Sequence, residues 1–363
     1  MSKTSLTPIK EIIKEAKKGK MFILVDDKNR ENEGDLVIPA SKCNSKNINF
    51  MAKHGRGLIC LALTKKKVDK LSLPLMSSVN KARMQTAFTV SIEAKKGITT
   101  GISAFDRAKT IKVAINSNSK KKDIVSPGHV FPLVAKSGGV LERAGHTEAS
   151  VDISKLANLN PSAVICEVMN EDGRMARYDD LLKFSKKHNL KIASIEDLIS
   201  YRLKNEKLII NTSNKNVLIE KFGKFEIKIF KNKLDGSEHF AITKGKFNYN
   251  KSIRVRVIST NIIKNIIDFK KNSLNNSLNY LSKFNNFALI LIKDQNLSIL
   301  KKNTDLTKDS NILRYYGIGA QIIKDLKIKN MILVSRSKKK IIGLEGYGIK
   351  ITKQEIIKWT KKF

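Results

Sequence analysis

The stretch MFILVDDKNRENEGDLVIPA, residues 21–40, places a short charged segment between two apolar runs. FILV and LVIPA are short and rich in branched aliphatic residues, which is typical of buried strands. The segment between them, residues 26–35, is dense in carboxylates and also contains Arg and Gly. A plain solvated turn needs fewer charges, so the loop is a candidate binding site.

The chain around this stretch alternates strand-like and helix-like segments up to about residue 203. Helices are expected where apolar residues recur every three to four positions, and strands where short apolar or alternating runs occur. The expected helices are residues 9–19, 47–55, 147–159, 178–190 and 195–203. The expected strands are residues 21–25, 35–40, 57–63, 86–94, 129–135 and 161–169. This order predicts an α/β domain of the α+β sandwich type over residues 1–203.

Residues 204–216, KNEKLIINTSNKN, are polar and rich in Lys and Asn, which predicts a linker. Two helices are expected after this linker. Strand-like runs are also expected there, at residues 217–230, 254–260, 287–294 and 330–335. The second part of the chain, residues 204–363, is therefore predicted to form a second, smaller α/β domain.

The composition fits a protein with packed cores and no membrane span. Of its 363 residues, 41% are hydrophobic, and no apolar run reaches the roughly 18 residues of a membrane helix. The first 20 residues lack the apolar segment of a signal peptide. Three widely spaced cysteines, Cys43, Cys60 and Cys166, indicate neither a disulfide framework nor a C-x-x-C metal site. We therefore expect a cytoplasmic protein.

The net charge of +37 raises the question of a nucleic-acid partner. Residues 204–363 carry 34 of the 70 basic and only 12 of the 33 acidic residues. Lys is abundant along the whole chain together with Ile and Asn, which indicates the compositional bias of an AT-rich genome. Aromatic residues make up 6%, and no stacking pattern is visible. We expect no nucleic-acid partner, although a positive field would favour a phosphorylated substrate.

Two polar clusters could bind ligands. Arg30–Asp35, RENEGD, sets carboxylates at a strand end, where they could ligate Mg²⁺; the alternative is a charged turn. Thr99–Ile111, TTGISAFDRAKTI, sets hydroxyls, Gly and Arg before a helix, where they could hold a phosphate. The alternative for this second cluster is an ordinary helix start with a Ser or Thr cap.

Two further features could take part in proton transfer. Ser126–Ser150 contains His129 and His146 within Gly- and Pro-rich loops, close to an Arg and a Thr. Glu167 lies inside an apolar strand, where a carboxylate needs a partner or has a raised pKa. The alternatives are a structural or surface role for each histidine and a buried ion pair for Glu167.

Taken together and in this order, seven segments resemble 3,4-dihydroxy-2-butanone 4-phosphate synthase of riboflavin biosynthesis, over about residues 5–203. They are DDKNRENEGDLVIPA, HGRGLICLAL, TAFTVSIEA, TTGISAFDRAKTI, PGHVFPL, GGVLERAGHTEASVD and CEVMNEDGRMAR. The resemblance implies conversion of D-ribulose 5-phosphate to 3,4-dihydroxy-2-butanone 4-phosphate and formate through an enediol. It also implies Mg²⁺ (or Mn²⁺) and a homodimer with active sites near the subunit interface.

The resemblance also implies roles for single residues. Glu31 and His146 match the metal ligands, and His129 and Glu167 match positions essential for catalysis. The matched substrate contacts are Arg30, Glu31, Asp35, Arg143, Ala144, Gly145, His146, Thr147 and Glu167. Asp35 is a third acid–base group, and either Asp35 or Glu167 could begin proton abstraction, with His129 assisting later. Asp26, Asp27 and Glu33 have no expected role.

The second half resembles GTP cyclohydrolase II in its opening strands and its closing segment, but its middle differs. That family uses three cysteines for zinc, whereas this chain has no Cys after Cys166. Ile258 stands at the family's His, residues 259–271 replace the cysteine segment, and QNLSILKKNT replaces the nucleotide-contacting segment. Without thiolates we expect no zinc and no GTP cyclohydrolase activity. A substitute zinc site, a regulatory or nucleic-acid-binding role and a role in dimer stability remain as alternatives.

Overall fold

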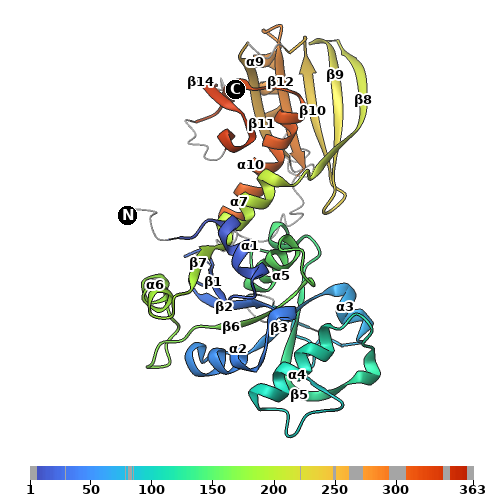
Figure 1. Ribbon diagram of the computed structural model, residues 1–363. Helices are drawn as coiled ribbons and strands as arrows, with labels where there is room; N and C mark the ends of the chain where they lie inside the picture. The colour runs from blue at the N-terminus through green and yellow to red at the C-terminus, as the bar shows by residue number, and fades with distance from the viewer. Residues whose placement is uncertain are drawn as a thin grey trace. The chain divides into compact units, whose positions relative to one another are not determined.

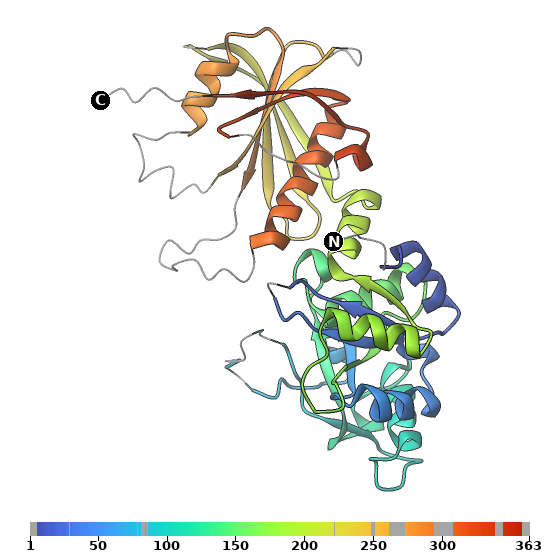
Figure 2. The same cartoon turned by 90° about the vertical axis from the view of Figure 1, so that its left-hand side faces the viewer.

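The computed structural model describes residues 6–28, 30–77, 79–80, 84, 86–220, 222–247, 251–260, 273–293, 308–337 and 344–357. The chain divides into two compact units, Met1–Tyr201 and Arg202–Phe363. Helix α7 (Ile195–Asn205) contains the boundary between them. Each unit is built on one seven-stranded mixed sheet with helices on both faces (Figure 1 and Figure 2).

The first unit contains short strands and mostly short helices. Its strands are β1 (Phe22–Val25), β2 (Gly34–Pro39), β3 (Cys60–Thr64), β4 (Ile92–Ala94), β5 (Ile124–Ala135), β6 (Ser162–Glu167) and β7 (Lys191–Ser194). Its helices before α7 are α1 (Ile9–Lys17), α2 (Ser45–Phe50), α3 (Lys65–Lys70), α4 (Ala104–Ile115), α5 (His146–Leu156) and α6 (Tyr178–Lys187). A π-helix, Met51–Gly55, directly continues α2.

The sheet of the first unit has the strand order β4-β5-β3-β6-β2-β1-β7. Strands β2 and β6 are antiparallel neighbours at its centre. Helix α5 packs on one face, against β1, β2, β3, β5 and β6. Small residues at that face, Ala62 and Ala135, pack with Val151 of α5. Because side chains alternate between faces along a strand, Asp35 and Glu167 point to the α5 face.

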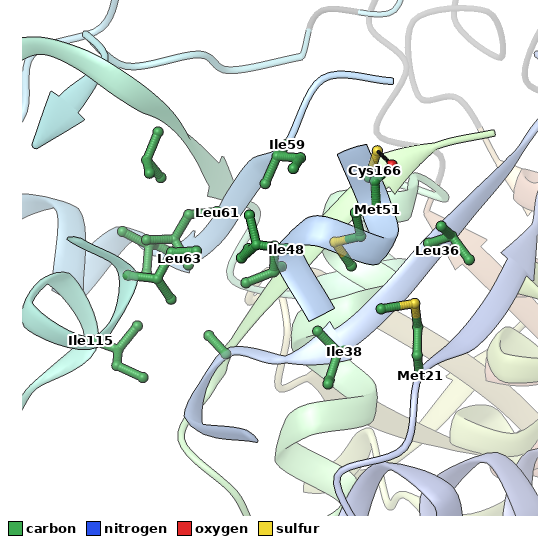
Figure 3. Close-up of a cluster of buried hydrophobic side chains, with 14 of the residues drawn as sticks. Met21, Leu36, Ile38, Ile48, Met51, Ile59, Leu61, Leu63, Ile115 and Cys166 are labelled. Atoms are coloured by element: carbon green, nitrogen blue, oxygen red, sulfur yellow. Dashed lines mark hydrogen bonds between the residues drawn. The ribbon is translucent and has the colours of Figure 1, made fainter. Parts of the chain in front are cut away.

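The opposite face of this sheet carries the main apolar core. Leu36 and Ile38 of β2, Leu61 of β3 and Ile48 of α2 pack there with Met51 and other apolar side chains. Figure 3 shows these side chains meeting between the strands and α2. Burial of this core, at about 25 cal/mol per Å² of apolar surface, is the main force that holds the strands in register. Register in turn decides which polar side chains meet on the α5 face.

The second unit contains seven strands and two described α-helices. The strands are β8 (Ile209–Ile219), β9 (Gly223–Asn232), β10 (Glu238–Lys244), β11 (Ile253–Thr260), β12 (Phe287–Lys293), β13 (Asn330–Ser335) and β14 (Lys350–Ile356). Their order is β14-β13-β11-β12-β10-β9-β8. Helix α10 (Lys308–Asp325) packs on one face and α9 (Ser273–Leu281) on the other. The strands β8, β9 and β10 are antiparallel, and β11 to β14 are parallel.

The predicted fold class, two domains of α/β type, is confirmed, but two local predictions are wrong and one strand was missed. Residues 209–216 of the predicted linker belong to β8, which pairs with β9 along its whole length. Of residues 86–94, only Ile92–Ala94 form a named strand, while Phe88 and Thr89 make isolated bridges. The strand β7 was not predicted between α6 and α7. Residues 261–271 and 295–304, which are expected to differ from the GTP cyclohydrolase II family, lie outside the described residues.

Among the described residues, no helix combines the length and the apolar character that a membrane crossing requires.

Candidate active site and metal centre

Asp26 organises the charged loop between β1 and β2. Its side chain is 1% exposed and accepts a hydrogen bond from Arg30 Nη1 at 2.7 Å. The same carboxylate accepts the backbone N–H of Glu31 at 3.2 Å and of Glu33 at 2.9 Å. These bonds fold the loop back on its own start and turn the Glu31 side chain toward the N-terminus of α5.

His146 is the first residue of α5 and meets this loop. Its Nδ1 lies 3.8 Å from Glu31 Oε2 and 3.7 Å from Asp35 Oδ1. One ligand atom each of Asp26, Glu31 and His146 can be chosen so that all three lie within 4.8 Å of one another. The Nε2 atom of His146 is buried and makes no hydrogen bond to any described residue. Three elements, the loop, β2 and α5, therefore bring the carboxylates of Asp26, Glu31 and Asp35 close to one imidazole.

This group fits a hard divalent cation such as Mg²⁺. Magnesium holds its ligands at about 2.0–2.1 Å, so two ligands of one ion lie at most about 4.2 Å apart. The 3.8 Å between His146 Nδ1 and Glu31 Oε2 meets this limit without movement. Arg30, whose Nη1 also donates to Glu31 Oε2 at 2.5 Å, offsets part of the negative charge.

Burial sets the protonation of these groups. It lowers the pKa of His146 to about 4, against the opposing charge of Asp26, so the imidazole is neutral at pH 7. A neutral imidazole can bind a metal without losing a proton. Burial also raises the pKa of Glu31, with Arg30 opposing, and it raises the pKa of Asp35 well above its usual value, helped by the charge of Glu167.

Asp35 and Glu167 are directly paired residues of β2 and β6. Paired residues of antiparallel strands place their side chains on the same face, about 5 Å apart. Asp35 is 3% exposed, whereas Glu167 is partly exposed and accepts the backbone N–H of Leu58 on Oε2 at 2.9 Å. Two carboxyl groups thus lie side by side next to His146, with different burial and different hydrogen-bond partners.

His129 lies on the same face but farther along the sheet. Cys60 of β3 pairs with Ile165 on one side and with Phe131 on the other. His129 lies two residues before Phe131, and Glu167 lies two residues after Ile165, so both lie at the same end of the strands. Because β3 lies between β5 and β6, two strand spacings, about 10 Å, separate His129 from Glu167. His129 Nδ1 is hydrogen-bonded to Glu93 of β4. The structure therefore does not bring His129 into contact with the group around His146.

Arg143 is held beside the N-terminus of α5 by Glu148. Its Nη1 donates to Glu148 Oε2 at 2.6 Å, and its Nη2 donates to Met84 O and Thr86 Oγ1, both at 3.0 Å. A Cβ on Gly145 would lie 2.4 Å from Arg143 Nη1, so a larger residue there would displace the guanidinium from this position.

Three neighbours of Arg143 belong to the same substrate-contact prediction. Ala144 is partly buried, Gly145 is the N-cap residue of α5, and Thr147 is 4% exposed in its first turn. The predicted contacts from Arg143 to Thr147 thus form one short segment that ends at His146.

The cluster Thr99–Ile111 forms a capped helix start. Asp106 Oδ1 accepts the backbone N–H of Thr99 at 3.1 Å, and Oδ2 accepts its hydroxyl at 2.7 Å and the N–H of Gly101 at 3.0 Å. Ser103 caps α4 by accepting the N–H of Asp106. The Asp106 carboxylate accepts the hydrogen bonds that a bound phosphate would accept. The geometry of this cluster therefore favours the helix-cap interpretation.

Sequence reasoning gave no role to Asp26, Glu148 or Arg177. Arg177 Nη1 donates to the backbone oxygens of Glu31 at 2.6 Å and Asn32 at 3.0 Å, which fixes the loop from the side of α6. Each of these residues acts through a polar neighbour rather than a motif of its own. In the sequence these residues could be noticed only as charged residues close to a predicted site residue. Charged residues make up 28% of the chain, so such neighbours are too common to indicate a role.

Comparison with known proteins gives two family matches. Residues 10–201 match the family 3,4-dihydroxy-2-butanone 4-phosphate synthase. Residues 211–355 match the family GTP cyclohydrolase II. The two matched segments lie in the first and second unit, respectively.

Curated relatives span nearly the whole chain. The riboflavin biosynthesis protein RibBA of Aquifex aeolicus is 44% identical over 374 residues, covering 96% of this chain and 92% of the relative. The 3,4-dihydroxy-2-butanone 4-phosphate synthase of Photobacterium phosphoreum is 42% identical, covering 96% of this chain and 98% of the relative. One relative is named for the synthase alone, and the other carries the name RibBA.

Solved structures agree with this result. RibBX of A. baumannii, described as a two-domain 3,4-dihydroxy-2-butanone 4-phosphate synthase, has a TM-score of 0.82 and 37% identity, covering 98% of this chain and all of that chain. A 3,4-dihydroxy-2-butanone 4-phosphate synthase in complex with two magnesium ions has a TM-score of 0.53 and 38% identity, covering 55% of this chain and 98% of that chain. The predicted enzyme class is confirmed: the chain belongs to the 3,4-dihydroxy-2-butanone 4-phosphate synthase family of riboflavin biosynthesis, and its second domain matches the GTP cyclohydrolase II family.

Proposed function

We propose that the first unit converts D-ribulose 5-phosphate to 3,4-dihydroxy-2-butanone 4-phosphate and formate, through an enediol, and that it requires Mg²⁺ or Mn²⁺. One observation carries this proposal: Glu31 and Asp35 each have a carboxylate oxygen within 3.8 Å of His146 Nδ1, on the face where Glu167 also lies. The reaction removes a proton next to a carbonyl group, rearranges the carbon chain and releases one carbon as formate. It therefore needs charge stabilisation and more than one acid–base group at one place.

Glu31 and His146 would hold the metal, with Asp26 close enough to assist. When bound, the cation would polarise adjacent oxygens of the sugar and stabilise the negative charge that develops as the proton leaves. The solved complex of a related synthase with two magnesium ions supports magnesium as the metal.

Asp35 and Glu167 would share the first proton transfers. Burial and the charge of Glu167 raise the pKa of Asp35 well above its usual value, which favours a carboxyl group that takes up and returns a proton. Glu167, paired with Asp35 and partly exposed, would take a proton from the substrate or return it. His129, about two strand spacings away, would act at a more distant carbon of the same substrate, with Glu93 orienting its ring.

The phosphate end of the substrate would lie at the start of α5. Backbone N–H groups at a helix N-terminus favour an anion. Arg143, Ala144, Gly145 and Thr147 would line this end, and Arg30, which is bonded to Asp26 and Glu31, would contact the sugar. The positive net charge of the chain would also favour a phosphorylated substrate.

Replacement Glu31→Gln tests the metal assignment. The change removes the negative charge of one ligand and keeps its size, so we expect Mg²⁺-dependent formate release from ribulose 5-phosphate to be abolished. Formate is measured enzymatically across a Mg²⁺ titration. Glu11→Gln, an acid on α1 that pairs with Lys14, is the matched control and should behave as the wild type. Near-normal turnover of Glu31→Gln would show that the metal assignment is wrong.

We further propose that the second unit has no GTP cyclohydrolase activity. This is supported by the sequence, which has no cysteine after Cys166 to form the thiolate site that zinc needs in this family. Ile258 of β11, at the position of the family's His, packs against the apolar cluster that includes side chains of α9.

The bifunctional alternative requires a substitute zinc site. Metal analysis of protein purified with zinc should find less than one tightly bound zinc per chain; a full equivalent would favour the alternative.

We also propose that the protein is a homodimer. Apolar side chains near the β4–β5 edge of the first unit are exposed, with Phe105 at 76%, Ile102 at 52% and Val125 at 41%. An exposed group of large apolar side chains is typical of a surface that another chain covers. Light scattering should therefore give about twice the 40.8 kDa of one chain, and a mass of one chain would contradict the dimer.

A further inference from the structure

Glu167 is held by a segment of the chain that has no assigned role. We propose that the turn Gly55–Leu58, which follows the π-helix, is the positioning element for the Glu167 carboxylate. Gly57 and the backbone N–H of Leu58 make the decisive contacts. This inference rests on the proposed function, in which Glu167 transfers a proton.

The backbone around Glu167 is fixed on both sides. On one side, the N–H of Val168 donates to Gly34 O at 3.0 Å, next to the pair formed by Asp35 and Glu167. On the other side, the N–H of Met169 donates to Gly55 O at 2.9 Å, and Arg56 forms a bridge with Val168. The end of β6 therefore continues as a backbone pair with the turn, and Gly57 faces Glu167.

Gly57 lies too close to Glu167 for any larger residue. A Cβ at this position would lie 2.5 Å from Glu167 O, 2.7 Å from its backbone N and 2.7 Å from Oε2. Real Cβ contacts below 3.0 Å essentially do not occur, and two of these three atoms belong to the backbone. A side chain at residue 57 would therefore displace Glu167 itself rather than a flexible neighbour.

The N–H of Leu58 fixes the orientation of the carboxylate. It donates to Glu167 Oε2 at 2.9 Å. Within the described parts of the chain, Oε1 has no hydrogen-bond partner. One oxygen is thus tied to the turn, and the other remains available for a proton of the substrate. A carboxylate held in one orientation loses less freedom when it reacts, which lowers the barrier.

The conformation of Arg56 explains how the turn reaches this position. Arg56 ends the π-helix with φ 67° and ψ −1°, in the left-handed region, and its N–H donates to Met51 O at 3.0 Å. L-residues other than glycine adopt this conformation only at an energetic cost. The Arg56 guanidinium offsets the cost by donating to Met169 O at 3.2 Å. Short π-helical segments are frequent near functional sites, where they redirect the following residues.

Replacement Gly57→Ala tests the inference in the full-length protein. Because Glu167 would shift by about an ångström, we expect kcat for formate release to fall by about 100-fold. The KM for ribulose 5-phosphate and the Mg²⁺ concentration for half-maximal rate should change less than about threefold, since the three atoms nearest a Cβ at residue 57 all belong to Glu167 and none to Glu31 or His146. Gly173→Ala is the control: it lies in the loop after β6, and its added Cβ would meet nothing within 4 Å. It should keep its kcat despite a positive φ.

A second pair of variants separates the hydrogen bond from packing. Leu58→Pro removes the N–H donor, and Leu58→Ala keeps it, so the proline variant should have a kcat at least about tenfold below that of the alanine variant. Wild-type turnover and its loss in Glu167→Gln establish the proposed function independently. If both hold, and every variant of Gly57 or Leu58 that folds keeps its kcat, the positioning role is wrong while the proposed function stands. If Glu167→Gln itself keeps full activity, the proposed role of Glu167 fails first.

Discussion

Asp26 shows at the scale of one residue how the charged loop obtains its shape. Its carboxylate accepts one side-chain and two backbone hydrogen bonds within the loop, at 2.7–3.2 Å. Glu31 can face His146 because Asp26 fixes the backbone N–H of Glu31 and the guanidinium of Arg30. The sequence predicted Arg30, Glu31 and Asp35 as site residues, but the organising role of Asp26 depends on the folded loop and could not be read from spacing.

Replacement Asp26→Asn should weaken metal binding without removing a predicted ligand. It removes the charge that holds Arg30, so Arg30 and Glu31 lose their fixed orientation. Changes to residues that support ligands typically reduce metal affinity 10- to 100-fold, and we expect at least about a tenfold higher Mg²⁺ requirement. The measurement is a Mg²⁺ titration of formate release. Asp27→Asn, at an exposed neighbouring position, is the control. Equal Mg²⁺ requirements for Asp26→Asn and wild type would contradict the role of Asp26.

Asp35 and Glu167 illustrate what the sequence could and could not indicate. An acid in an apolar strand was recognisable at Glu167, and the apolar run after Asp35 indicated burial. Their pairing across β2 and β6 depends on register between strands more than 120 residues apart, which no local pattern encodes.

Elements with a strong local pattern were predicted best. Helix α1 buries Ile9, Ile12, Ile13 and Ala16, the spacing of one helix face, and β13 (Asn330–Ser335) coincides with its predicted strand. Strand β8 was missed because its exposed polar residues resemble a linker; only pairing with β9 makes it a strand. Strand β7 is only four residues long, lies between two helices and pairs in parallel with β1. Its formation therefore depends on pairing with β1 rather than on a local sequence pattern.

The π-helix and α6 meet through a group of aromatic rings that should make the first unit sensitive to acid. The rings of His54 and His188 have centroids 4.7 Å apart and pack with Phe50 and Phe184. Burial lowers the pKa of His54, aided by the charge of Lys53, and burial also lowers the pKa of His188. Unfolded histidines have a pKa of about 6.5, so the unfolded state binds these protons first as pH falls. The stability they contribute is complete above about pH 6.5 and decreases below it.

Thermal unfolding of the first unit between pH 7.5 and pH 5 measures this effect. The melting temperature should fall less with decreasing pH in the double variant His54→Asn, His188→Asn than in the wild type. Phe184→Leu changes the packing on His188 without removing a titrating group, so it should lower the melting temperature and keep a steeper pH slope than the double variant. Identical slopes for the wild type and the double variant would contradict the role of these histidines.

At the scale of the whole molecule, each unit has its own sheet and its own apolar core. The solved magnesium complex of a related synthase matches 55% of this chain over 98% of its own chain, so that solved chain corresponds in length to one such unit. We therefore expect residues 1–205 to fold and to retain formate release within about threefold of the full chain, because all proposed site residues lie before residue 168.

Activity of this truncated protein is compared with that of the full chain at equal concentration, with circular dichroism as a check of folding. Loss of activity in a folded truncated protein would instead assign the second unit a structural role in the synthase reaction.

The most direct measurement is a paired formate assay on one preparation of the full-length protein. One sample receives ribulose 5-phosphate with Mg²⁺, and the other receives GTP with Zn²⁺ and Mg²⁺. The proposed function predicts formate from ribulose 5-phosphate, abolished by EDTA and restored by Mg²⁺, and none from GTP. Absence of formate from ribulose 5-phosphate would contradict the central claim, and clear release from GTP would show that the second unit is an active cyclohydrolase.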